Sequence, residues 1–386
     1  MKAWPKVALG DLLRRSEEPA AIDAAAEYHE VTIKLWGKGI VSRGKVRGSD
    51  VVSVRRVVRS KQLILSKIDA RNGAIGLVPP ELDGAIASND FPSFEFRDLS
   101  RCDPAFMGWL VRSAPFVELC KAASEGTTNR VRIKEDRFLE QEVALPPPSE
   151  QEAIVTRLEA LTEKTRQVKA HLDAVERDAE HLLALRFRDA IARAPLRPMA
   201  QVAPSVRRAV DIDIAASYRE LGARSFGKGL FVKPDFEGAE ATWQKPVWIK
   251  SGDLVLSNIK AWEGAIAVAA RAHDGCIASH RYITCVPDPA VATTGFLAYY
   301  LLSDDGLEKI GLASPGTADR NRTLSLGNLG NIEVPLPPVA AQQAFNQLQA
   351  QVAALKTKHT AIRRANAALL PATLERVFAA SPAAPN

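Results

Sequence analysis

The most constraining feature of this chain is that pieces of its first half return, in the same order, in its second half. The matching pieces are Gly37–Gly39 with Gly227–Gly229, Leu63–Ile68 with Leu254–Ile259, Gly73–Ile75 with Gly264–Ile266, Ile86–Ser88 with Ile277–Ser279, and Leu145–Pro147 plus Gln151 with Leu336–Pro338 plus Gln342. The distance between copies far exceeds the roughly 20–50 residues of a solenoid repeat. It predicts a duplicated unit of one domain and one helix, related by an internal pseudo-twofold axis. Duplex DNA is the commonest twofold partner, so the duplication favours DNA as the ligand.

Composition places the chain among soluble proteins that are long enough for two or three domains. Its 386 residues are 46% hydrophobic and 25% charged, and no apolar run reaches the roughly 18 residues that a membrane span needs. Residues 1–5 lack the apolar core of a signal peptide, so we expect a cytoplasmic protein. The four cysteines have no Cys-x-x-Cys spacing, which favours reduced thiols over disulfides or a zinc site; they are Cys102, Cys120, Cys276 and Cys285.

Positive charge is concentrated in the first half. Residues 30–75 hold 11 basic and three acidic residues, a net charge of +8, against +6 for the whole chain. The matching region, residues 215–285, holds nine basic and seven acidic residues. Such a local excess is typical of phosphate contact, with a solvated basic face as the alternative. We therefore expect the two halves to contribute unequally to non-specific DNA affinity.

Two long helices are predicted, one after each Leu-Pro-Pro turn. The first has Ser149 as its expected N-cap and a heptad seam of Ile154, Leu158, Leu161, Thr165, Val168, Leu172, Val175, Ala179 and Leu182. The second carries Phe345, Leu348, Val352, Leu355, His359, Ile362, Asn366 and Leu369 at the same spacing, and Pro371 is expected to kink or end it. The polar seam residues are interpreted as setting the register or as tolerated. We expect the helices to pack antiparallel and to hold two globular units apart.

The segments between the helices have the pattern of mixed α/β domains. Apolar or alternating runs bounded by Gly, Asn, Asp and Pro predict strands at 51–58, 62–68, 74–78 and 94–96. Residues 105–121 predict a helix, which is repeated at 295–312.

Searches for a catalytic or cofactor motif find none. The run Gly222–Lys228 has the spacing of a P-loop, but Gly229 stands where a Ser or Thr would bind magnesium. The six histidines are scattered without metal-ligand spacing, and the chain has no Asn-Pro-Pro-Tyr tetrapeptide of a base-flipping methyltransferase. The pattern indicates a chain without an active site of its own.

Several motifs in combination resemble the specificity (S) subunits of type I restriction-modification systems. They are the duplicated Leu-Pro-Pro…Gln element before each long helix, the run Leu65–Gly73, the run Ser88–Pro92, and Gly126–Arg130. The resemblance extends from Trp4 to about Phe378. The second copy departs from the pattern at Asn258–Glu263, and Arg320–Arg322 lies two residues later than its counterpart, which weakens the transfer of residue roles to that half.

The resemblance implies two target-recognition domains that read the two parts of a bipartite, asymmetric DNA sequence. It implies domains at 1–148 and 195–337, a central coiled-coil helix at 149–194 and a distal one at 338–380. Methylation and cleavage would belong to partners: two modification subunits that bind S-adenosylmethionine, and restriction subunits with an ATP- and Mg-dependent motor. This chain would bind no cofactor, no metal and no membrane.

The candidate DNA-binding residues combine the basic cluster with polar side chains near the matching motifs. Basic residues are expected on phosphates, and a few Arg, Asn or Thr side chains on base edges. The set is Lys38, Arg43, Lys45, Arg47, Arg55, Arg56, Lys67, Arg71, Asn72, Thr128, Asn129, Arg130, Lys228, Lys260, Arg281, Arg320, Asn321 and Arg322.

Two other classes of protein remain as alternatives. One is a DNA-modifying enzyme, a nuclease or methyltransferase, whose site is not recognisable from sequence. The other is a non-catalytic coiled-coil scaffold or another kind of DNA-binding protein. In the favoured interpretation the helices act as a ruler, with half-site centres about 10 bp apart.

Overall fold

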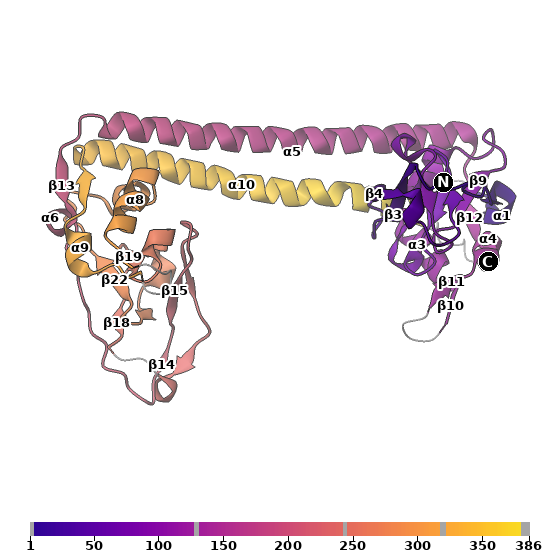
Figure 1. Ribbon diagram of the computed structural model, residues 1–386. Coiled ribbons are helices and arrows are strands. Elements are labelled where there is room, and N and C mark those ends of the chain that lie inside the picture. The colour runs from indigo at the N-terminus through magenta and orange to yellow at the C-terminus, as the bar shows by residue number, and fades with distance from the viewer. Residues whose placement is uncertain (1–3, 127–130, 242–244, 317–321, 380–386) are drawn as a thin grey trace, which may run out of the picture. The chain divides into compact units, whose positions relative to one another are not determined.

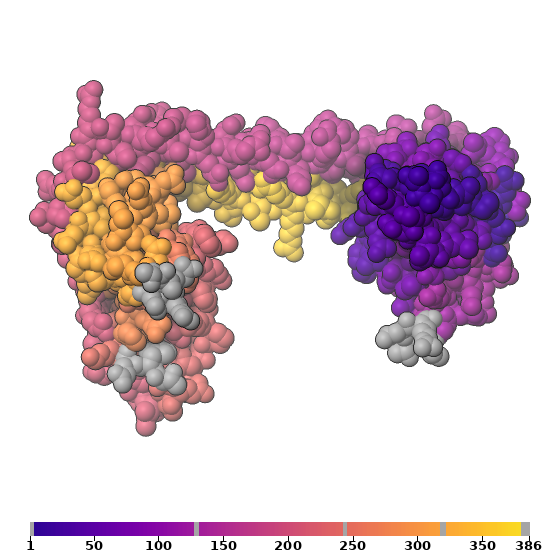
Figure 2. All heavy atoms as spheres, viewed as in Figure 1, coloured from indigo at the N-terminus to yellow at the C-terminus, as the bar shows by residue number. Residues whose placement is uncertain are grey.

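The computed structural model describes residues 4–126, 131–241, 245–316 and 322–379. Residue contacts divide the chain into two compact units (Figure 1, and as spheres in Figure 2). Unit 1 combines residues 1–172 with 359–386, and unit 2 comprises residues 173–358. Helix α5 (Pro148–Ile191) and helix α10 (Val339–Phe378) each contribute one part to unit 1 and the other part to unit 2. The bounds of the four segments expected from sequence remain predictions.

Unit 1 is a mixed α/β structure with two four-stranded sheets. One sheet has the order β2 (Leu13–Ser16), β9 (Ser93–Phe96), β6 (Leu63–Leu65), β7 (Ile75–Leu77), and the other has β4 (Ile40–Arg47), β3 (Glu27–Ile33), β8 (Ile86–Ala87), β5 (Arg56–Val57). Two smaller pairs are β1 (Lys6–Ala8) with β12 (Glu142–Ala144) and β10 (Ser124–Glu125) with β11 (Arg132–Ile133). Its short helices are α1 (Leu9–Leu12), α2 (Pro104–Leu110), α3 (Ala114–Ala122) and α4 (Glu135–Glu140), with 3-10 turns η1 (Gly48–Asp50), η2 (Ala70–Asn72) and η3 (Pro80–Leu82).

Unit 2 repeats much of this architecture with shorter strands. Its three-stranded sheet has the order β20 (Ile266–Val268), β19 (Leu254–Ser257), β22 (Tyr282–Cys285). The pairs are β13 (Leu196–Pro198) with β23 (Glu333–Pro335), β14 (Ser217–Tyr218) with β17 (Phe236–Glu237), β15 (Leu221–Ala223) with β16 (Leu230–Val232), and β18 (Val247–Trp248) with β21 (Ile277–Ala278). The helices are α6 (Met199–Val202), α7 (Thr294–Leu301), α8 (Asp304–Leu312) and α9 (Leu326–Gly330), with 3-10 turns η5 (Gly238–Glu240), η6 (Ala261–Glu263) and η7 (Arg271–His273).

A buried glutamine joins each globular part to its long helix. Gln151 donates from Nε2 to the carbonyls of Arg101 and Pro146 at 2.9 and 2.8 Å, and its Oε1 accepts from the backbone N–H of Asp103 at 2.8 Å. Gln342 repeats the arrangement in unit 2, with the carbonyls of Val291 and Pro337 as acceptors and the N–H of Thr293 as donor. Both side chains are fully buried. The repeated Leu-Pro-Pro…Gln element is thus a structural joint.

The two long helices pack against each other within each unit. In unit 1, Asn366 donates from Nδ2 to the carbonyl of Thr165 at 2.9 Å, so this polar seam residue has a packing role. In unit 2, Lys356 forms an ion pair with Glu180 at 2.6 Å. The rings of Phe187 and Phe345 lie 5.3 Å apart. In unit 2, residue numbers rise along α5 from Glu180 to Phe187 as those of their partners fall along α10 from Lys356 to Phe345, which is the predicted antiparallel arrangement.

The predicted heptad seam is wrong at four positions. Val168 and Leu182 on α5, and Ile362 and Leu369 on α10, are exposed. In their place Leu183 and Phe187 of α5 are buried in the unit 2 core, and Leu374 and Phe378 of α10 in the unit 1 core. The helix ends pack against globular cores as well as against each other. The residues buried there are therefore those that face the core, not those that a regular two-helix seam would bury.

The expected helix ends also need correction. Helix α5 begins at Pro148 rather than after a Ser149 cap, and proline is favoured in the first turn because its missing N–H has no helical partner there. Pro371 does not end α10, which continues to Phe378. The lost hydrogen bond is tolerated because Leu374 and Phe378 are buried beyond it, with the Phe378 ring 5.7 Å from that of Phe106.

Strands and short helices differ from the predictions in three places. Residues 51–55 form no strand, and Val52 and Val54 are exposed. Each predicted short helix is two helices, because Ser113 and Ser303 cap a second one by accepting from the N–H groups of Phe116 and Gly306. The β3–β4 hairpin was not predicted.

Candidate nucleic-acid interface

Strand β4 exposes three of the predicted phosphate-binding residues, Arg43, Lys45 and Arg47. Lys45 Nζ lies 3.5 Å from a carboxylate oxygen of Glu27. Among the residues that the structure describes, Arg43 and Arg47 have no ion-pair partner. Two guanidinium groups on this strand are therefore available to an anionic ligand.

A β-bulge at Arg43 changes the direction of the strand. Glu30 is paired with Gly44 and Val31 with Ser42, so Arg43 is an extra residue between two ladder pairs. Strand β4 is at the edge of its sheet, where bulges commonly redirect a side chain. The bulge therefore gives Arg43 an orientation that simple strand alternation would not.

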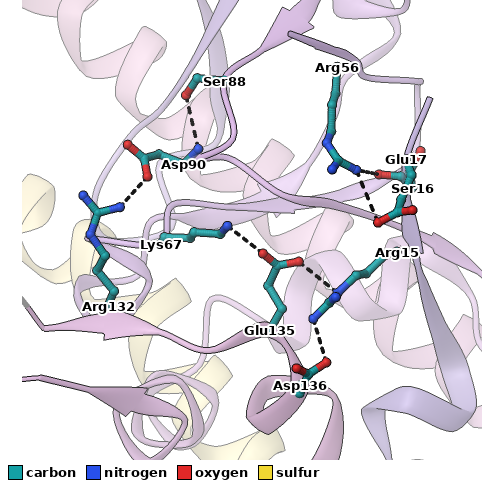
Figure 3. A network of polar contacts seen from close by, with 10 residues as sticks. All are labelled: Arg15, Ser16, Glu17, Arg56, Lys67, Ser88, Asp90, Arg132, Glu135 and Asp136. Carbon is teal, nitrogen blue, oxygen red and sulfur yellow. Dashed lines mark hydrogen bonds and ion pairs between the residues drawn. The ribbon is translucent and has the colours of Figure 1, made fainter. Parts of the chain in front are cut away.

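Lys67 belongs to a network of charges around Glu135 (Figure 3). The Glu135 carboxylate lies 2.7 Å from Lys67 Nζ and 2.9 Å from Arg15 Nε, and Arg15 also bonds Asp136 at 2.7 Å. Glu135 is mostly buried, so the pairs are weakly screened. Lys67 is thus held by its own chain, and its predicted DNA contact remains a prediction.

The backbone around Lys67 connects three segments that are distant in sequence. Its N–H donates to the carbonyl of Asp90, and its carbonyl accepts from the N–H of Ile133, both at 2.8 Å. The Asp90 carboxylate pairs with Arg132 (Figure 3). Arg132 and Ile133 form β11, which comes shortly after Gly126–Arg130 in the sequence. Thr128, Asn129 and Arg130, which were predicted to bind DNA, lie outside the described residues.

Arg55 and Arg56 are paired within unit 1. Arg55 Nη2 lies 2.9 Å from Glu30, and both side chains are largely buried. Arg56 Nη1 lies 3.6 Å from Glu17 and donates to the carbonyl of Ser16 at 3.4 Å. Their charge is offset in the free protein, so replacing them would disturb packing as well as any phosphate contact.

The tip of the β3–β4 hairpin brings Lys38 beside the η2 turn. The N–H of Trp36 donates to the carbonyl of Asn72 at 3.0 Å, and that of Gly37 to Gly73 at 2.9 Å. The Lys38 side chain is exposed. Two segments of the predicted interface, around Lys38 and Asn72, therefore meet in the fold.

The side chains of Arg71 and Asn72 are less available than their positions suggest. Asn72 donates from Nδ2 to Asp69 at 3.3 Å. Arg71 Nε is buried and has no hydrogen-bond partner within the described structure. If either residue contacts a base, it must use hydrogen-bond donors other than the Asn72 Nδ2–H that bonds Asp69 and the buried Arg71 Nε–H.

In unit 2 the corresponding tip carries Lys228. The N–H groups of Phe226 and Gly227 donate to the carbonyls of Glu263 and Gly264 at 2.7 and 2.9 Å. Lys228 Nζ lies 5.6 Å from the centre of the Phe226 ring. The two units therefore attach their tips to the following turn in the same way.

Lys260 and Arg322 both lie against Trp262. Lys260 Nζ is 5.1 Å from the ring centre and pairs with Glu263 at 2.5 Å, a contact that lowers the pKa of that carboxyl group. The guanidinium of Arg322 is 4.5 Å from the same ring and donates to the carbonyls of Gly311 and Ser314. These bonds cap the end of α8, so Arg322 has a structural role whatever else it contacts.

The remaining predicted residues of unit 2 are Arg281, Arg320 and Asn321. Arg281 is exposed and has no ion-pair partner among the described residues. Its carbonyl accepts from the N–H of Asn258 at 2.8 Å. Arg320 and Asn321 lie outside the described residues.

The hairpins of the two units differ in charge at corresponding positions. Counting from the matched Gly-Lys-Gly, Lys45 corresponds to Asp235 and Arg47 to Glu237. Arg43 corresponds to Lys233, which pairs with Glu220 at 2.7 Å. The basic strand is therefore a property of unit 1, in agreement with the uneven charge of the two halves.

The described residues hold no group of three or more His, Cys, Asp or Glu side chains that could bind a metal ion. Burial raises the pKa of the Cys102, Cys120 and Cys285 thiols to about 12, so they stay protonated near neutral pH. All four cysteines are free. No helix among the described residues is long and apolar enough to cross a membrane.

A scan against protein-family models finds no match, and a sequence search of curated proteins finds none either. Solved structures do match. The crystal structure of the HsdS subunit from Thermoanaerobacter tengcongensis aligns with a TM-score of 0.66 and 21% identity, over 98% of this chain and 97% of that one. A chain from a structure on complex assembly and conformational transition of the type I restriction-modification system aligns with a TM-score of 0.69 and 21% identity, over 98% of both chains.

The chain has the fold of an HsdS specificity subunit. The alignments cover both units and both long helices, so the similarity is not confined to one motif. The HsdS fold confirms the predicted mixed α/β architecture with two long helices.

The set of DNA-binding residues predicted from sequence leaves out four residues at the hairpin tips of this fold, although Lys34 was counted in the basic cluster. Lys34 and Trp36 precede Gly37 in unit 1, and Arg224 and Phe226 precede Gly227 in unit 2. The repeated Gly-Lys-Gly was the available signal, because the aromatic residue comes directly before it in both copies.

Proposed function

We propose that this chain is the DNA sequence-recognition subunit of a type I restriction-modification complex, binding a bipartite, asymmetric target with one half-site for each unit. The proposal rests on the likeness to HsdS structures over almost the whole chain. It rests also on Arg43 and Arg47 of strand β4, which have no ion-pair partner among the described residues. The chain performs no chemistry itself. Its proposed location is the cytoplasm, where its DNA target is found.

Methylation and cleavage are assigned to partner subunits. Two modification subunits carry S-adenosylmethionine, and restriction subunits carry ATP and Mg. Exposed apolar side chains along the long helices support docking: Val168, Ile362 and Leu369 in unit 1, and Leu182 and Leu185 in unit 2. Because both units expose such residues, two modification subunits per chain are proposed, which native mass spectrometry of a co-expressed complex would count.

The alternative classes differ from this proposal in simple assays. An enzyme with an unrecognised site would give a cleaved or methylated product when the chain alone meets DNA, metal and S-adenosylmethionine. A scaffold that does not bind DNA would show no salt-dependent affinity. The proposed subunit gives no product alone and binds DNA less tightly as salt rises.

The basic strand provides the test of DNA binding. Replacing Arg43 and Arg47 together with Gln is expected to weaken binding to all duplexes alike, because phosphate contacts carry no sequence information. The slope of log affinity against log salt should decrease by about two, at roughly 0.9 per lost phosphate contact. Because neither residue forms a described ion pair, the unfolding temperature should stay unchanged. Fluorescence anisotropy at several salt concentrations measures the slope.

The matched control removes two charges elsewhere in unit 1, by Lys121→Gln and Arg166→Gln. Both residues are exposed and pair only locally, with Glu118 and Glu163. An equal loss of slope in the control would assign the effect to net charge rather than to strand β4. An unchanged slope in the Arg43 and Arg47 variant would remove these residues from the interface.

A further inference from the structure

Both units present the same series of chemical types at a hairpin tip. In unit 1 the series is Lys34, Leu35, Trp36, Gly37, Lys38, Gly39, and in unit 2 it is Arg224, Ser225, Phe226, Gly227, Lys228, Gly229. The shared order is basic, variable, aromatic, Gly, Lys, Gly. Trp36 is 70% exposed and Phe226 is 75% exposed. Each unit therefore places one large aromatic ring in solvent between two basic side chains.

The backbone holds each aromatic residue in a costly conformation. Trp36 has φ of 61° and Phe226 has φ of 62°, in the left-handed region that glycine adopts far more easily. Burial does not compensate, because both rings are exposed. Exposed bulky residues with strained backbone are found mainly at functional sites. Folding alone gives no reason for an aromatic residue at either position.

The strained tips are also fixed in place. Trp36 and Gly37 donate to η2, and Phe226 and Gly227 donate to η6, as described above. A Cβ atom on Gly73 or Gly264 would meet the tip backbone at 3.2–3.3 Å, so glycine permits the close approach. An aromatic ring presented on a fixed backbone loses little conformational entropy when it binds.

The surrounding charge favours a nucleic acid as the ligand of these rings. Within the described residues, Lys34, Lys38, Arg224 and Lys228 have no ion-pair partner. The charge on the strand after the tip changes sign between the units, from Lys45 to Asp235. The tip itself keeps the same order of basic, aromatic and glycine residues in both units. Exposed aromatic rings beside basic side chains are typical of surfaces that bind nucleic acid, where the rings stack on the bases of a single strand or insert between the base steps of a duplex.

We propose that Trp36 and Phe226 are base-contacting residues, one for each recognition unit, whose rings insert between neighbouring base pairs of the bound duplex and stack on a base, while the flanking basic side chains contact phosphates. Every base has a flat face on which a ring can stack, so stacking depends little on the DNA sequence. The same aromatic position can therefore serve two units that recognise different half-sites. The inference rests on the proposed function and adds to it the residues that engage bases in both units.

The test uses the full-length chain and the duplex that this chain enriches from a randomised library. Trp36→Ala and Phe226→Ala should each weaken binding to that duplex by about ten-fold, the magnitude expected for one lost stacking contact. Trp36→Phe should keep most of the affinity, since unit 2 uses Phe. Leu99→Ala and Leu312→Ala remove exposed apolar side chains elsewhere in units 1 and 2 and should bind normally.

Trp36→Gly separates binding from folding. Glycine relieves the left-handed strain, so the unfolding temperature should stay the same or rise while DNA affinity falls. A spectroscopic signature is available as well. The difference in emission between the wild-type chain and Trp36→Phe isolates Trp36, and this emission should be quenched by the selected duplex.

Three results would overturn the inference. Unchanged affinity in both alanine variants, with normal wild-type binding, would remove the rings from the DNA while leaving the proposed function intact. Normal DNA affinity with loss of co-purifying modification subunit would assign the tips to a protein partner. Failure of the wild-type chain to bind or enrich any duplex would reject the proposed function and this inference together.

Discussion

Inserting one helical turn into both long helices is expected to lengthen the preferred DNA spacer by about one or two base pairs and to leave both half-site sequences unchanged. Four residues add about 6 Å and a net rotation of about 40°. The insertions belong after Leu172 in α5 and after Lys358 in α10, where the chain passes between units. At these points, contacts within each unit, such as Thr165 with Asn366, are preserved.

The measurement is a selection of preferred duplexes by the insertion variant and by the wild-type chain from the same library. Affinity of the variant for the parental spacing should fall by about ten-fold or more, because reaching both half-sites then requires deformation of the DNA. A folded variant that binds DNA with the parental spacer would show that the helices do not set the spacing.

Replacing Gln151 with Leu is expected to destabilise unit 1 by about 3–5 kcal/mol. The side chain makes three hydrogen bonds to backbone groups, and leucine would leave each of them without a partner at a cost of roughly 1–3 kcal/mol apiece, not fully additive. Gln342→Leu should do the same to unit 2. Chemical denaturation followed by circular dichroism should show each variant lowering a different transition.

Gln167→Leu on helix α5 is the matched control. The Gln167 side chain is exposed, and its one hydrogen bond within the described part of the chain is to the neighbouring Glu163. Its replacement should therefore change the unfolding free energy by less than about 0.5 kcal/mol. If Gln151→Leu were as mild as Gln167→Leu, the buried joint would not hold the helix to the globular part.

The sequence was most informative where a repeated motif has a local physical cause. The Leu-Pro-Pro…Gln element recurs because each copy builds the same buried joint, which is why the helix starts could be placed within one residue at Pro148 and Val339. The positive charge of residues 30–75 was equally visible. The sequence could not show which of these basic side chains form ion pairs within the protein. Arg55, for example, pairs with Glu30 through a tertiary contact.

The features that were missed depend on distant parts of the chain. Strand β4 carries a Gly and three basic residues, and it is a strand because it pairs with β3. Pro371 suggests a helix end, but Leu374 and Phe378 keep the helix intact by burial in a core formed by residues far earlier in sequence. The heptad pattern of a helix cannot predict contacts of this kind, because it carries no information on the globular core.

The central claim, that this chain recognises a bipartite DNA target, is tested most directly by sequencing the duplexes that the full-length wild-type chain enriches from a randomised library. The expected result is two short, different motifs separated by a gap of fixed length in which no base is preferred. Half-site centres should lie about 10 bp apart. A single contiguous motif, or no enrichment over the input library, would contradict the claim.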